Sequence, residues 1–100
     1  MPDMPELDIN QKAKVFNALS DPTRLQIVEQ LADGQERTSK DIAEHLGITL
    51  ALFCHHASTL NQAGILIKRK QGQSSYNRLN LEMLRQCLHS LGGPPNTQPK

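Results

Sequence analysis

The feature that most constrains the fold of this chain is a change of hydrophobic period at Gly64. Before Gly64, apolar residues recur at three- and four-residue spacing, which is typical of amphipathic helices. After it, two short runs, residues 65–70 and 75–79, alternate in the manner of strands, and residues 71–74 predict the loop of a hairpin. The sequence therefore predicts a mainly α-helical domain that carries one β-hairpin.

Two helices are predicted in the first third of the chain. Asp8, with Gln11 three residues later, resembles a capping box, and Asp21-Pro22 supplies an N-cap followed by a proline at the first helical position. The apolar stripes are formed by Ile9, Ala13, Phe16 and Leu19 in the first helix and by Leu25, Val28 and Leu31 in the second.

A helix-turn-helix is predicted next. Thr38 or Ser39 caps a short third helix, Gly47 ends it, and Thr49 caps a fourth helix that runs to Gly64. A short helix, a tight turn with glycine and a longer helix form the helix-turn-helix layout. The hairpin that follows then occupies the position of a wing.

A fifth helix completes the predicted domain. It begins at about Leu81 and places Leu84, Leu88 and Leu91 in a stripe. The order is α-α-α-α-β-β-α, a winged helix-turn-helix over residues 8–91. Residues 1–7 are expected to be a flexible N-terminus and residues 92–100 a disordered C-terminal tail, because both are polar and proline-rich.

The net charge of +1 conceals an asymmetry between the two halves of the chain. Residues 1–45 carry a net charge of −4 and residues 46–100 a net charge of +5. This pattern suggests that the second half faces a polyanion, with a solvated charged face as the alternative. No apolar run is long enough to span a membrane, so we expect a cytoplasmic protein with no membrane contact, with Cys54 and Cys87 as reduced thiols.

Three segments in order resemble one family of bacterial regulators: VFNALSDPTRLQIVEQLADG (residues 15–34), SKDIAEHLGI (residues 39–48) and HHASTLNQAGILIKRKQGQSSYNRL (residues 55–79). This is the arsenic-repressor and metallothionein-repressor (ArsR/SmtB) family, and the resemblance extends over about residues 9–91. It implies a dimeric winged-helix repressor that leaves its operator when an effector binds.

The metal sites implied by the resemblance have both changed in this chain. Metal-sensing relatives carry a Cys-x-Cys pair at the start of the third helix, where this chain has Arg-Thr-Ser-Lys at residues 37–40. Others bind zinc through an Asp-x-His and a pair on the last helix, where this chain offers only Glu82 and His89. We therefore predict no metal-binding residue and no cofactor.

The fourth helix is expected to enter the major groove of duplex DNA. Helical spacing turns Leu52, Phe53, His56 and Leu60 inward in this prediction. The residues predicted to contact DNA are Ser39, Thr49, Leu50, Ala51, Cys54, His55, Ser58, Lys68, Arg69, Lys70 and Gln73.

For each group of these residues there is a chemical reason to expect contact with DNA, and for some groups there is an alternative structural role. Leu50 and Ala51 can contact thymine methyl groups, and His55 and Ser58 can hydrogen-bond to base edges or phosphates. Ser39 and Thr49 start helices near phosphates or serve only as caps. On the wing, strand alternation sends Lys68 and Lys70 one way and Arg69 the other, so the three cannot reach DNA equally. A charged edge strand is the alternative for the wing.

Cys54 is the predicted effector or redox site, because it lies on the proposed DNA face near a helix start that favours a thiolate. A small packing residue is the alternative for Cys54, and Cys87 is predicted to be a buried, inert thiol. The adjacent Cys54 and His55 point about 100° apart and lack an orienting partner, so the chain is not expected to be an enzyme.

The predicted function is that of a sequence-specific DNA-binding repressor released by an effector. Homodimerisation is expected through Ile9, Phe16, Leu84, Leu88 and Leu91. Two alternatives remain at this point: a winged-helix module for protein interaction, suggested by the apolar Leu50 and Ala51, and a metal sensor with a non-standard site.

Overall fold

The computed structural model describes residues 7–91. The predicted disordered tail and all but one residue of the predicted flexible N-terminus lie outside the described residues. The exception, Leu7, is half-buried and packs against the hydrophobic core.

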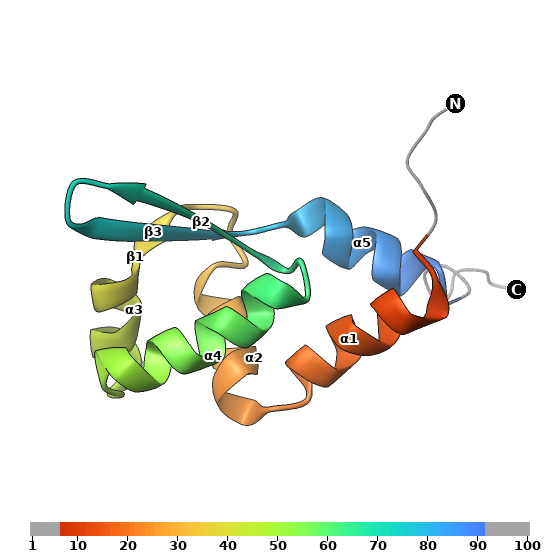
Figure 1. Cartoon of the computed structure of the whole chain (residues 1–100), viewed down its shortest axis with the longest axis horizontal. Helices are drawn as coiled ribbons and strands as arrows, with labels where there is room; N and C mark the ends of the chain where they lie inside the picture. The colour runs from red at the N-terminus through yellow and green to blue at the C-terminus, as the bar shows by residue number, and fades with distance from the viewer. Residues whose placement is uncertain (1–6, 92–100) are drawn as a thin grey trace, which may run out of the picture.

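Residues 7–91 form five helices and a three-stranded sheet, and their arrangement can be followed in Figure 1. In chain order the elements are α1 (Ile9–Leu19), α2 (Pro22–Gln30), β1 (Arg37–Thr38), α3 (Ser39–Leu46), α4 (Leu50–Gln62), β2 (Leu66–Gln71), β3 (Ser74–Leu79) and α5 (Leu81–His89). The predicted winged helix-turn-helix is confirmed, with β1 as an added strand.

The helix starts follow from side-chain caps that were readable in the sequence. Asp8, Asp21, Thr38 and Thr49 each accept a hydrogen bond from the backbone N–H three residues later, at 2.8–3.0 Å. Thr38, not Ser39, is therefore the cap of α3. Gly47 ends α3 in the left-handed conformation, with φ +71°, which lets the chain turn directly into α4.

The sheet is antiparallel in the order β1-β3-β2. The hairpin turn is only Gly72-Gln73, so both strands extend further toward the tip than predicted. Lys68 lies opposite Asn77 and Arg69 opposite Tyr76. β1 was not predicted, because two residues are too few to show an alternating pattern.

The core lies where α1–α4 meet the base of the hairpin. From α4 it takes Phe53, Ala57 and Leu60, all fully buried. The prediction that Leu52 turns inward is wrong, because Leu52 is 41% exposed. Leu52 lies about 100° around the helix from Phe53, on the edge that the core does not cover.

The first and last helices lie side by side at the end of the molecule opposite the hairpin tip (Figure 1). α1 buries Val15 and Ala18, whereas Ile9 and Ala13 of the predicted stripe are exposed. On α5 only Cys87 is buried, and Leu88 is exposed. No helix within residues 7–91 is long and apolar enough to cross a membrane.

Candidate nucleic-acid interface

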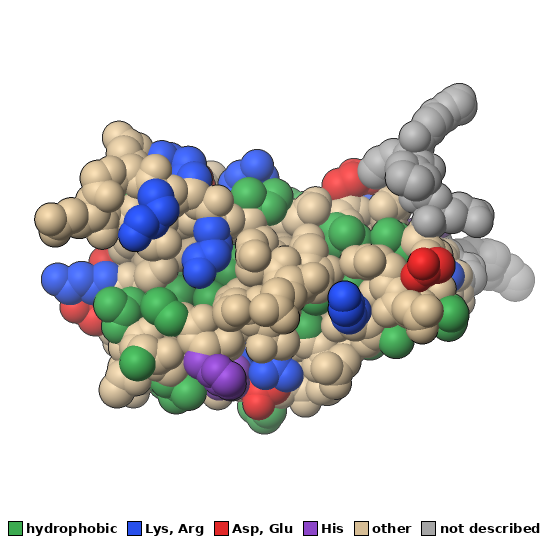
Figure 2. Space-filling model, in the orientation of Figure 1, with side chains coloured by type: hydrophobic (Ala, Val, Ile, Leu, Met, Phe, Trp, Pro, Cys, Tyr) green, Lys and Arg blue, Asp and Glu red, His purple; other side chains and the backbone are tan. Residues whose placement is uncertain are grey.

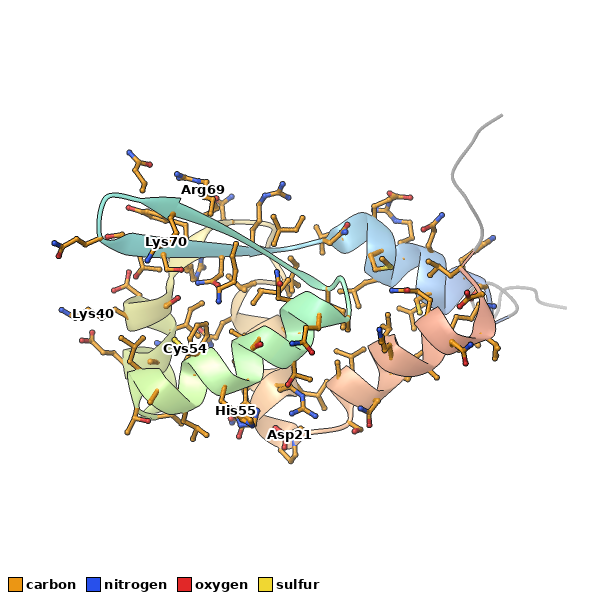
Figure 3. The ribbon with its side chains drawn as sticks, viewed as in Figure 1. Asp21, Lys40, Cys54, His55, Arg69 and Lys70 are labelled. Carbon is orange, nitrogen blue, oxygen red and sulfur yellow. The ribbon has the colours of Figure 1, made fainter. Side chains whose placement is uncertain are left out.

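A groove of about 640 Å³ separates the hairpin from α3 and the start of α4. Figure 3 shows Lys40, Cys54 and Lys70, from α3, α4 and β2, around it. Its lining consists of Thr38, Ser39, Lys40, Leu50, Cys54, Lys68, Arg69, Lys70, Gln73, Ser74 and Ser75. The tertiary structure thus brings the first turns of the predicted recognition helix together with the wing.

Four basic side chains line this groove, and three of them are lysines. Lys40, Lys68 and Lys70 are exposed and have no ion-pair partner among the residues that the structure describes. Figure 2 shows Lys and Arg side chains gathered over the hairpin end of the molecule. Unpaired ammonium groups around a groove suit the binding of phosphates.

Lys40 was absent from the predicted DNA-binding residues. Its position in the first turn of the first helix of the helix-turn-helix was visible in the sequence. What the sequence did not show was that this turn lies across the groove from Lys68 and Lys70.

Arg69 also lines the groove, and its guanidinium is paired with a carboxylate. Its Nε and Nη2 donate to the two carboxylate oxygens of Glu36, both at 2.8 Å, and its guanidinium lies 4.6 Å from the ring centroid of Tyr76. The hydrogen-bonded Arg69 holds the pKa of Glu36 below its ordinary value, and the carboxylate raises the pKa of Arg69. Strand alternation places the Arg69 side chain on the other face of the hairpin from Lys68 and Lys70, although all three residues line the groove. The contact of Arg69 with DNA stays a prediction, and in this structure its guanidinium is paired with Glu36.

Ser39 lines the groove, but its side chain is nearly buried. It is 6% exposed, and its Oγ accepts a hydrogen bond from Nδ2 of the fully buried Asn77 at 3.0 Å. The same Nδ2 also donates to the carbonyl oxygen of Arg37 at 3.3 Å. The Ser39 side chain connects α3 to β3, and its contact with a phosphate stays a prediction.

The α4 residues that were predicted to turn outward are all exposed: Leu50, Ala51, Cys54, His55 and Ser58. Thr49 is also exposed and caps the helix. The whole of α4 contains no Lys, Arg, Asp or Glu. The charge of the interface therefore comes from α3 and β2, and the recognition helix itself is neutral apart from its histidines.

The two cysteines lie in opposite environments. Cys54 is exposed and lines the groove, whereas Cys87 is the buried residue of α5. Burial raises the pKa of the Cys87 thiol, which keeps that thiol protonated. Only Cys54 can meet a ligand or oxidant from solution.

His56 belongs to a junction that joins α4 to α2. Its Nδ1 lies 3.3 Å from Arg24 Nη1, and Arg24 Nε donates to the carbonyl oxygen of Ala18 at 2.6 Å. Asp21 caps α2 through the Arg24 N–H, which lowers the pKa of the Asp21 carboxyl. Within residues 7–91, no three His, Cys, Asp or Glu side chains gather closely enough to hold a metal ion.

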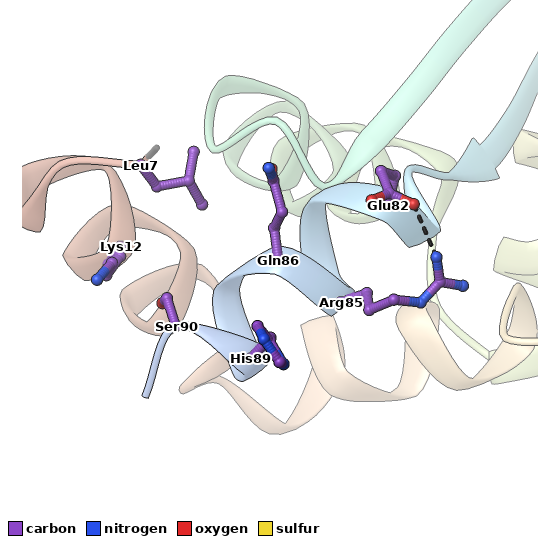
Figure 4. A pocket seen from close by; sticks show the side chains of 7 residues that line it. All are labelled: Leu7, Lys12, Glu82, Arg85, Gln86, His89 and Ser90. Atoms are coloured by element: carbon purple, nitrogen blue, oxygen red, sulfur yellow. Dashed lines mark hydrogen bonds and ion pairs between the residues drawn. The ribbon is translucent and has the colours of Figure 1, made fainter. Parts of the chain in front are cut away.

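A second hollow, of about 520 Å³, lies between the start of α1 and α5 (Figure 4). It is lined by Leu7, Lys12, Glu82, Arg85, Gln86, His89 and Ser90. Glu82 Oε1 accepts a hydrogen bond from Arg85 Nη1 at 2.7 Å. Glu82 is therefore engaged with a cation on its own helix.

Known proteins share both the sequence pattern and this geometry. The sequence model described as "Bacterial regulatory protein, arsR family" matches residues 21–68. The transcriptional repressor SdpR of Bacillus subtilis is 39% identical over 75 residues, which cover 75% of this chain and 82% of SdpR. The chain belongs to the arsR family. A probable mercury resistance operon repressor of Streptomyces lividans is 35% identical to this arsR-family protein over 76% of the chain and 65% of the relative.

Solved structures agree with this membership. An ArsR-like transcriptional regulator from Rhodococcus superposes with a TM-score of 0.73 at 26% identity, covering 82% of this chain and 76% of that one. The homodimeric winged helix-turn-helix DNA-binding domain of a possible ArsR-family regulator from Mycobacterium bovis gives a TM-score of 0.68 at 28% identity, with 90% of each chain covered. The arsR-family protein described here is a regulatory protein of the winged helix-turn-helix type.

Proposed function

We propose that this arsR-family protein is a transcriptional repressor that binds specific duplex DNA as a homodimer in the cytoplasm and is released by an effector. The observation that carries the proposal is the groove, where the start of a neutral helix meets three lysines without ion-pair partners among the described residues. An α-helix fits the major groove, and lysines beside it neutralise phosphates. The named relatives are regulators, and we propose no catalytic role.

We propose separate roles for the residues of the groove and of the exposed face of α4. Lys40, Lys68 and Lys70 contact phosphates, and the start of α4 at Thr49 directs backbone N–H groups toward one. Gln73, at the hairpin turn, reaches the minor groove or its phosphates. The residues that meet base edges are Leu50, Ala51, Cys54, His55 and Ser58.

The end of the molecule away from the groove supports a homodimer. Ile9, Leu88 and Leu91 are exposed, and Phe16 and Leu84 are half-buried and pack against the core. A small core without tryptophan gains stability when a second copy covers such a surface. The homodimeric state of the relative from Mycobacterium bovis points the same way.

Cys54 is the proposed effector site. Peroxide would oxidise the Cys54 thiol to a sulfenic acid, with formation of an S–O bond and release of one water, and a reducing thiol would reverse the change. The modified sulfur would lie in the groove, where it obstructs DNA directly. The exposure of Cys54 and the burial of Cys87 support this choice.

Salt-dependent binding to duplex DNA tests the main proposal. The logarithm of the association constant should fall linearly with the logarithm of salt concentration, with a slope of about −0.9 for each phosphate contact. Lys40→Gln, Lys68→Gln and Lys70→Gln should each flatten that slope, whereas Lys14→Gln on the exposed surface of α1 should not. Binding that ignores salt, or that requires a protein partner, would show instead that the wing serves protein interaction.

A second experiment tests the effector. Mild peroxide should release the reduced protein from DNA, and Cys54→Ser should keep DNA binding but ignore peroxide. Cys87→Ser, the matched substitution of a buried thiol, should respond as the parent does. Release of Cys54→Ser by the same peroxide treatment would remove Cys54 from the regulatory role.

A further inference from the structure

The recognition helix lacks the side chains that read most bases. Guanine is read by Arg or Lys in paired hydrogen bonds, adenine by Asn or Gln, and cytosine through an acceptor carboxylate. α4 contains none of the four charged residue types. Its two amides, Asn61 and Gln62, occupy the last two positions of the helix, and Asn61 Nδ2 donates to the carbonyl oxygen of Leu66 at 2.8 Å.

Apolar groups occupy the places where base readers would stand. Leu50 is 50% exposed in the first turn, and Ala51 follows it. Cys54 lies one turn further on in the row of Leu50, and both residues line the groove. The base feature that an apolar side chain recognises in the major groove is the C5-methyl group of thymine.

We propose that this protein selects its operator chiefly by thymine methyl groups, which Leu50, Ala51 and the Cys54 side chain contact. The inference rests on the DNA-binding function proposed above and specifies what that interface reads. His55 and Ser58 add single hydrogen bonds, which discriminate less than paired ones. Lys40, Lys68 and Lys70 then supply affinity without sequence preference, because phosphates carry no sequence information.

Replacement of thymine by deoxyuridine tests this inference on the full chain, because it removes only the methyl group and leaves every hydrogen-bonding edge intact. A duplex is first selected from a random pool and then synthesised with uracil at each thymine of the site. Affinity should fall about fourfold for each contacted methyl group that is removed, the factor that corresponds to burial of one such group. A duplex of unrelated sequence should bind the protein equally with thymine or uracil.

Two exposed leucines provide a matched pair of variants. Leu50→Ala should abolish the uracil effect at the thymine that Leu50 contacts and leave the salt slope unchanged. Leu25, on α2, is 46% exposed and does not line the groove. Leu25→Ala should retain the full uracil effect.

The outcomes separate this inference from the function on which it rests. Equal affinity for the thymine and uracil forms of the selected duplex, with normal salt dependence, would overturn methyl reading and leave the repressor in place. A full uracil effect in Leu50→Ala would overturn the assignment of Leu50. Absence of salt-dependent binding to any duplex would overturn the proposed function itself.

Discussion

At the scale of single residues, burial separates polar groups that maintain the fold from those available for function. Ser39 and Cys87 are both nearly inaccessible, and each is engaged or surrounded within the chain. Thr49 and Cys54 are exposed at the groove end of α4. Residue type alone did not distinguish Ser39 from Thr49, since both stand near the start of a helix.

The two thiols should therefore react differently. In the native protein a water-soluble disulfide reagent should modify one thiol rapidly, and that thiol should be Cys54. Cys87 should react only after unfolding, because burial both shields it and raises its pKa. A reagent that releases one coloured thiolate for each thiol it modifies counts the reactive thiols with and without denaturant. Rapid release of two equivalents from the folded protein would contradict this prediction.

Ser39→Ala should destabilise the fold by about 1 kcal/mol, because the buried Asn77 amide is deprived of a hydrogen-bond acceptor. Ser74→Ala, at an exposed hairpin position, is the matched control and should change the free energy of unfolding by less than about 0.5 kcal/mol. Urea denaturation measures both. Equal midpoints for the two variants would show that the Ser39–Asn77 hydrogen bond is not stabilising.

At the scale of elements, the wing is a hairpin with two different faces. Lys68, Arg69 and Lys70 all line the groove. Arg69 is also held by Glu36, from the segment that precedes β1, and by Tyr76. The ion pair ties β2 to the far edge of the sheet, across β3. One strand therefore carries two lysines that we propose contact DNA and an arginine whose ion pair supports the sheet.

This division predicts unequal effects within three consecutive basic residues. Lys68→Gln and Lys70→Gln should each flatten the salt dependence of DNA binding, by about 0.9 for each phosphate that the variant no longer neutralises. Arg69→Gln should leave the slope close to that of the parent, since its charge is already neutralised by Glu36. A slope reduced as much by Arg69→Gln as by Lys70→Gln would mean that Arg69 leaves Glu36 when DNA binds.

The same pair predicts a pH dependence of stability. Because the folded-state pKa of Glu36 is lowered, its stabilising contribution is fully present above the unfolded pKa of about 4.5 and is lost as pH falls through the folded value. Glu36→Gln should remove this loss of stability at acid pH, because the amide does not titrate. Thermal unfolding between neutral pH and pH 3 compares the two proteins, and identical pH profiles would contradict the pairing.

At the scale of the whole molecule, the proposed DNA-binding surface and the proposed dimer surface lie at different ends. The groove and its lysines lie at the hairpin end, and α1 and α5 lie together at the other (Figures 1 and 2). Two copies joined through α1 and α5 would leave both grooves open. This arrangement allows DNA binding and dimerisation to occur together.

Leu88→Glu should convert the proposed dimer into a monomer, because it places a charge in the apolar surface between two copies. Leu25→Glu introduces the same charge at another exposed leucine and should leave the dimer intact. Sedimentation velocity at micromolar concentration distinguishes the two masses. A parent protein of monomer mass under these conditions would overturn the proposed homodimer.

The sequence by itself determined the features that depend on neighbours three or four residues away. The caps at Asp8, Asp21 and Thr49, the left-handed turn at Gly47 and the change of period at Gly64 define the winged helix-turn-helix locally. These signals are strong because each cap satisfies a backbone N–H that would otherwise lack a partner at its own helix start.

Only the tertiary structure decided which side chains are available to DNA. Arg69 meets Glu36 across 33 residues of chain, and Asn77 meets Ser39 across 38. The same folding places Lys40 across the groove from the wing and leaves Leu52 outside the core. Such contacts depend on how distant segments pack. Neither the hydrophobic period nor a helix cap indicates which distant residue a side chain will contact.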